Sequence, residues 1–121
     1  MNEERFVIVV KPDGWHGLVH CFPGDTLPLK DLQDMVGGNI ETVPTVLVDG
    51  WSHEKGVQIV MLVNEEGKLQ ELPINQLATN LSVLWDDVVV GNAVILGARG
   101  DEMIGLTREA AENIVKKWME K

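Results

Sequence analysis

Several residue types on which common chemistries depend are scarce in this chain. Its 121 residues include no tyrosine, one cysteine (Cys21) and two serines. A lone cysteine excludes an intramolecular disulfide and fits a reducing cytosol. Neither Ser52 nor Ser82 lies in a Gly-x-Ser-x-Gly motif, so a serine hydrolase is not expected.

Long apolar runs are also missing. None approaches the ~20 residues that a helix needs to cross a bilayer. The charged start of the chain, Met1–Arg5, does not resemble a signal peptide. Together these features predict a cytoplasmic protein without a membrane contact.

Positive charge is the third shortage. The chain has 19 acidic and 10 basic residues and a net charge of −9. No basic cluster offsets the acidic excess, so direct binding to nucleic acid is not expected. An acidic surface that imitates DNA is an alternative. The acids occur as dispersed pairs, such as Glu65-Glu66, and an ordinary soluble acidic surface explains them better.

The remaining composition is that of a folded domain. At 13.4 kDa with 45% apolar residues, the chain is predicted to form a single domain over residues 1–121. Apolar spacings of three and four predict a short helix at about 28–36, another at 75–81 and a C-terminal helix at about 107–119. Strands are predicted at 5–11, 17–22, 40–48, 57–63, 69–72 and 88–96. Short connections favour antiparallel pairing with the helices on one face, which is an α+β fold.

The segment Leu62–Asn75 gives the most specific structural expectation. Gly67 can adopt a positive φ in a tight turn, so the strand at 57–63 is predicted to pair with Leu69–Leu72 as a hairpin. Pro73 would end this pairing because it has no N–H to donate.

Four segments in order carry a family resemblance: Leu32–Glu41, Asn64–Lys68, Leu72–Asn75 and Gly91–Ala93. With them the chain resembles the domain of unknown function 3846, small proteins of phages and other bacterial mobile elements. The resemblance covers roughly 29–96, and it departs at Asn39, where the family often has an aromatic residue. The family has no established activity, so the resemblance implies a mobile-element context and no catalytic residues.

Neither a metal site nor a catalytic pair is visible. His16 and His20 would lie about 13 Å apart on a strand, too far to share a metal, and His53 is remote in sequence. Cys21 would face away from its neighbour His20, which leaves the thiol without a base. We therefore expect no metal and no other cofactor, and an enzyme is the less favoured hypothesis.

The candidate ligand-binding residues are Asn64, Asn75, Asn92 and Arg99. The asparagines fall in or beside the family-like segments, and their amides can read a polar ligand or bond local backbone. Asn75 and Asn92 are expected to converge, and Arg99 would add a positive charge for a phosphorylated ligand.

Three tryptophans in predicted connections, Trp15, Trp51 and Trp85, are candidates for a partner surface, because a tryptophan there covers the core rim or anchors a partner. The predicted function is non-enzymatic binding of a host protein, or of a small polar or phosphorylated metabolite, with a counter-defence role. A DNA mimic that inhibits a host DNA-binding protein is the alternative. The sequence leaves open whether copies of the chain associate.

Overall fold

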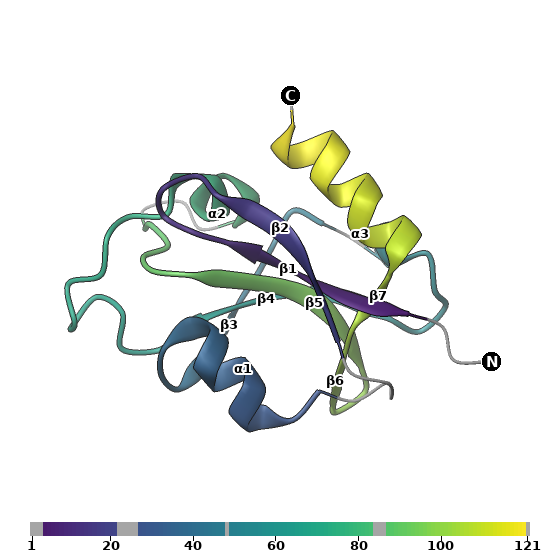
Figure 1. The fold of residues 1–121 in the computed structure, drawn as a ribbon, viewed down its shortest axis with the longest axis horizontal. Helices are drawn as coiled ribbons and strands as arrows, with labels where there is room; N and C mark the ends of the chain where they lie inside the picture. The colour runs from purple at the N-terminus through teal and green to yellow at the C-terminus, as the bar shows by residue number, and fades with distance from the viewer. Residues whose placement is uncertain (1–3, 22–26, 48, 84–86, 121) are drawn as a thin grey trace.

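A computed structural model describes residues 4–21, 27–47, 49–83 and 87–120. One antiparallel sheet organises them, with its main strands in the order β2-β1-β5-β4-β3 (Figure 1). Additional pairing joins β6 to β5 and β7 to β1. The strands are β1 (Arg5–Val10), β2 (His16–His20), β3 (Ile40–Val43), β4 (Gln58–Asn64), β5 (Ala93–Arg99), β6 (Glu102–Ile104) and β7 (Leu106–Thr107).

Helices cover both faces of this sheet. Figure 1 shows α1 (Leu29–Val36) on one face and α3 (Arg108–Ile114) on the other, with α2 (Gln76–Leu81) on the same side as α3. The predicted α+β class, with an antiparallel sheet and a C-terminal helix packed on it, is confirmed. The expectation that all helices share one face is wrong.

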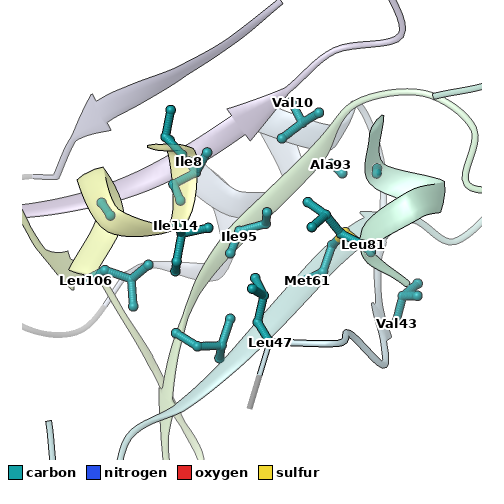
Figure 2. Packing of buried hydrophobic residues seen from close by; sticks show 14 of the residues in the cluster. Ile8, Val10, Val43, Leu47, Met61, Leu81, Ala93, Ile95, Leu106 and Ile114 are labelled. Atoms are coloured by element: carbon teal, nitrogen blue, oxygen red, sulfur yellow. The ribbon is translucent and has the colours of Figure 1, made fainter. Parts of the chain in front are cut away.

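The alternation of side chains along β1 explains the two layers. All six residues of β1 are buried. Ile8 and Val10 pack with Ile114 of α3, whereas Val7 and Val9 pack with Leu32 of α1. Figure 2 shows the larger of the two cores, in which side chains from β1, β4 and β5 meet those of α2 and α3. A strand with both faces buried reads as a continuous apolar run, which is how β1 appears in the sequence.

The predicted helix ends agree closely with the structure. Gly37 takes a left-handed conformation, with φ of 83°, and its N–H donates to Gln33 O, which closes α1. Thr107 caps α3 by accepting a hydrogen bond from the N–H of Ala110. Past Ile114 the helix widens into a π turn, Val115–Met119. Trp118 on this turn packs edge-on against Trp51, with the ring centroids 5.8 Å apart.

The predicted hairpin is wrong. Residues 65–71 form consecutive turns, and β4 pairs instead with β3 and β5. Leu69 is 84% exposed, so it does not enter the core. Gly67 is not among the glycines with positive φ in the described part of the chain. Glycine fits at this position because it has no side chain: an added Cβ would lie 2.8 Å from Val90 Cγ2.

Two strand boundaries also differ from prediction. β3 ends at Val43, because Pro44 has no N–H for the ladder. β5 starts at Ala93 because Gly91 has a φ of 75°, which interrupts the extended backbone before the strand.

Gly105 lies between β6 and β7 and has a packing role that the sequence did not predict. Its backbone approaches Arg5 so closely that an added Cβ would lie 2.6 Å from Arg5 Cβ. None of the described helices is long and apolar enough to cross a membrane.

Candidate binding groove

The four family-like segments meet where β4 ends and β5 begins. There they line a groove of about 330 Å³. Its lining residues are Pro12, Val36, Gly37, Asn64, Gln70, Leu72, Pro73, Gly91 and Asn92. We call it the amide groove, because Asn64, Gln70 and Asn92 supply its side-chain amides. A neighbouring hollow of about 400 Å³ shares Pro12, Pro73 and Asn92 with it and adds Lys11 and Asp13.

Asn64 is a structural junction in the wall of the groove. Its side chain is buried, and its Nδ2 donates to Val36 O and Gln70 Oε1, both at 3.3 Å. Its Oδ1 accepts from the N–H of Glu66 at 2.8 Å. The amide therefore joins the end of α1 to the turns that follow β4. Gly38 leaves room for it, since a Cβ there would lie 3.0 Å from Nδ2.

Asn75 lies beneath the groove and is fully buried. Its Oδ1 caps α2 by accepting from the N–H of Ala78 at 3.1 Å. Its Nδ2 donates to Val10 O at 2.9 Å and to Gly91 O at 2.8 Å. Asn75 therefore contacts the backbone of Gly91, the residue that precedes Asn92. With its oxygen and its nitrogen engaged inside the fold, the Asn75 amide cannot serve as a ligand contact.

Gln70 and Asn92 retain hydrogen-bonding capacity. Asn92 is half-buried, and its Nδ2 donates to Met35 O at 3.3 Å. Gln70 is exposed and uses its Oε1 to accept from Asn64. Within the described residues, neither the Oδ1 of Asn92 nor the Nε2 of Gln70 has a protein partner. The groove therefore offers one acceptor and one donor group from amides that are partly held in place.

Arg99 does not join this groove. Asn92 immediately precedes β5 and Arg99 ends it, which separates them by about 23 Å at ~3.3 Å per residue. The Arg99 guanidinium lies 3.8 Å from the carboxylate of Glu54 at the opposite end of the sheet. A phosphate held near Asn92 would therefore not be neutralised by Arg99.

The local charges do not favour an anion. Gly37 and Val36 place the C-terminal end of α1 in the groove wall, and this end carries the partial negative charge of the helix. Lys11 and Asp13 in the adjoining hollow have opposite charges. Asp13 accepts a hydrogen bond from the N–H of Trp15, and Lys11 Nζ lies 5.0 Å from the centre of the Trp15 ring.

The three candidate tryptophans have different environments. Trp15 is 49% exposed on the β1–β2 turn, close to the hollow through Lys11. Trp51 is half-buried and packs on the core with Trp118, so it contributes to the fold. Trp85 lies outside the described residues. Trp15 is therefore the one of these whose exposed ring is placed near the groove.

Ionised side chains gather at the other end of the sheet, around a crevice of about 510 Å³. Arg5 is 8% exposed and forms a two-pronged ion pair with Glu54, in which Nη2 lies 3.0 Å from Oε2. Arg108 is 2.9 Å from the carboxylate of Glu4 and stacks over Phe6. Sequence reasoning missed this network. An arginine at the start of an apolar strand is the signal that could have indicated a buried ion pair.

His53 and Cys21 are two further titratable side chains at this end of the sheet. His53 has a φ of 59° and lies 3.7 Å from the carboxylate of Glu109. Burial raises the pKa of the Cys21 thiol to about 11, against a smaller opposing effect of Arg5. The thiol is therefore protonated at neutral pH and is a poor nucleophile. In the described ranges, no group of three or more histidine, cysteine or acidic side chains is arranged to hold a metal ion.

A comparison with protein families matches residues 4–119 to the domain of unknown function 3846 (DUF3846). The match extends beyond the central segments that carry the resemblance in the sequence, and it includes β1, β2 and α3. No curated protein and no solved structure matches the chain.

Proposed function

The chain belongs to the domain of unknown function 3846 family, and from that premise we propose a non-enzymatic binding role. The protein acts as an accessory protein of a phage or mobile element in the bacterial cytoplasm, where it captures a small, neutral polar ligand in the amide groove. One observation carries this proposal: four segments far apart in sequence line one groove, and two of its amides keep unused hydrogen-bonding groups.

The residues that line the groove support a role in ligand binding rather than in catalysis. Its side chains are amides and apolar groups, and none of them ionises near neutral pH. A general acid, a general base or an activated nucleophile is therefore absent from the lining residues. Volumes of about 330 and 400 Å³ for the groove and the adjoining hollow fall in the range of small-molecule sites.

A neutral ligand is better supported than a phosphorylated one. Arg99 is remote, the end of α1 contributes negative potential, and Asp13 offsets the charge of Lys11. A phosphorylated ligand would rely on Lys11 alone, within a chain of net charge −9. A polar molecule with one donor and one acceptor can use Asn92 Oδ1 and Gln70 Nε2 without an ionic contact.

Native mass spectrometry of the purified protein, followed by denaturation, tests the proposal by releasing and identifying any bound molecule. The second arm is calorimetric titration with matched pairs, a nucleoside with its 5′-monophosphate and a hexose with its 6-phosphate. We expect a released neutral molecule, or binding of the neutral member at least as tightly as the phosphorylated one. Binding of the phosphorylated members alone would contradict the proposal that the ligand is neutral. The absence of binding in both arms would contradict the proposal that the amide groove binds a ligand.

Variants locate any binding observed. The double change Gln70→Ala and Asn92→Ala should weaken binding about tenfold or more, equivalent to ~1.4 kcal/mol. Asn80→Ala is the matched control, because Asn80 is exposed on α2 and contacts Gln76 rather than the groove. Equal losses in the two proteins would place the ligand elsewhere.

An acidic mimic of DNA is the second proposal, motivated by the net charge of −9. The carboxylates of Glu4 and Glu54 lie against Arg108 and Arg5, which interrupts the negative surface around the charged crevice. This arrangement supports mimicry less than it supports a binding module. If this protein competed with duplex DNA for binding to a host DNA-binding protein, that result would favour DNA mimicry.

A further inference from the structure

A second concavity borders the same turns on the opposite face of the sheet. Val43 and Val63 line it together with Val89, and all three belong to the core beneath α2 and α3. The amide groove instead includes Val36, which belongs to the core under α1. We call this second concavity, of about 280 Å³, the valine hollow. It shares Asn64 with the amide groove, and its other lining residues are different.

Two exposed apolar side chains border the valine hollow. Leu69 is 84% exposed and Val88 is 37% exposed, and both lie next to the apolar floor. A single exposed leucine is ordinary on a protein surface. Two such residues beside a hollow with a valine floor form an apolar site, which a partner's apolar side chain can contact.

The polar residues around the hollow are mainly acidic. Glu41 and Glu65 line it, and within the described ranges neither carboxylate has a cationic partner. Lys68 is ion-paired with Asp87, so its charge is already balanced. The same pair lowers the pKa of the Asp87 carboxyl, mainly through its hydrogen bond with Lys68. Counted over the described residues, the hollow therefore presents two carboxylates without an ion-pair partner around an apolar floor.

We propose that the valine hollow docks a partner protein through an apolar side chain flanked by lysine or arginine residues. The apolar side chain covers Val43, Val63 and Val89 beside Leu69, and the flanking cations approach Glu41 and Glu65. A second copy of this chain is a poor occupant, because its net charge of −9 meets an acidic rim. This interaction extends beyond small-ligand capture, and it does not require that the amide groove be occupied.

Fluorescence anisotropy with a labelled peptide, a central leucine between lysines, tests the docking site directly. We expect binding that weakens as NaCl is raised, because the flanking contacts are ionic. Replacing the peptide's leucine with serine, or its lysines with glutamates, should each reduce affinity at least about tenfold. Failure of the lysine–leucine peptide to bind would overturn the proposal.

Paired variants separate docking from general attraction between a basic peptide and an acidic protein. Glu41→Lys and Leu69→Ser should each weaken peptide binding about tenfold. Asp101→Lys makes the same charge change on the β5–β6 turn, and Leu29→Ser removes an exposed leucine of α1; both should leave binding within about twofold. Equal loss with Asp101→Lys and Glu41→Lys would show non-specific attraction and would overturn the site. Unchanged melting temperatures confirm that the variants remain folded.

Discussion

The two ends of the β4–β5 pair satisfy their polar groups in different ways. At the end near Arg99, ionised side chains lie against one another, as in Arg5 with Glu54 and Arg108 with Glu4. At the end near Asn64, neutral amides bond backbone groups. Two of the amides there, on Gln70 and Asn92, are only partly used.

The difference follows from the cost of burying charge. A buried guanidinium needs its carboxylate, because an unpaired ion loses far more solvation than an unpaired amide. The ion pairs at the charged end therefore serve to stabilise the fold. An amide at the edge of a groove can exchange water for a ligand at little cost, and for this reason we place ligand binding at the neutral end.

The largest expected effect comes from breaking the charged end. Glu54→Ala removes the carboxylate that forms the two-pronged ion pair with the Arg5 guanidinium, which is 8% exposed. We expect a loss of about 3 kcal/mol in the free energy of unfolding, measured by urea denaturation. The exposed Glu109→Ala serves as control and should cost less than about 0.5 kcal/mol. A loss below about 1 kcal/mol for Glu54→Ala would mean that the pair does not secure this end.

Asn75→Ala tests whether the buried amide is structural. The change removes the cap of α2 and leaves the carbonyls of Val10 and Gly91 without this donor. We expect a cost of about 2 kcal/mol by the same measurement. Asn80→Ala, an asparagine exposed on the surface of α2, should change stability little. Equal stability of the two variants would contradict the role of Asn75.

A smaller effect should appear at high pH through Cys21, whose N–H donates to Arg5 O beside the charged end. Burial raises the pKa of the Cys21 thiol from 9.0 to about 11. The unfolded thiol therefore loses its proton first, so the stability present below pH 9 declines as pH rises from about 9 to 11. Cys21→Ala should decline less over this window. Parallel pH profiles for the two proteins would rule out this contribution.

Replacing Asn92 with alanine should have the smallest effect on folding. Its side chain contributes one hydrogen bond of 3.3 Å to Met35 O and is half-buried. We expect a stability change of about 0.5 kcal/mol or less by urea denaturation. A cost comparable to that of Asn75→Ala would show that Asn92 also belongs to the structural amides.

Sequence patterns predicted correctly those elements that depend on residues adjacent to one another in the chain. The apolar run of β1, the end of α1 at Gly37 and the start of α3 after Thr107 each depend on neighbouring residues, and the predicted ranges 5–11, 28–36 and 107–119 agree with them. Gly67 was assigned to a hairpin turn because glycine can adopt the positive φ of a tight turn. Its cause is non-local, since its missing side chain leaves space for Val90, which is distant in sequence.

The candidate site shows the same division. Asn75 was identified by its position in a family-like segment, but its role depends on Val10 and Gly91, which only the folded chain brings to it. Arg99 was assigned to the same site because it follows the last long strand. The length of β5 places it at the other end. Leu69 was placed on a paired strand, and its exposure follows from the turns that replace the predicted hairpin.

Hydrogen exchange of the side-chain amides, followed by NMR on ¹⁵N-labelled protein, tests the central distinction between structural and available amides. The account predicts slow exchange for the NH₂ groups of Asn75 and Asn64, which are buried and hydrogen-bonded. It predicts fast exchange for Gln70, which is exposed. Fast exchange at Asn75, or protection of Gln70 equal to that of Asn75, would contradict it.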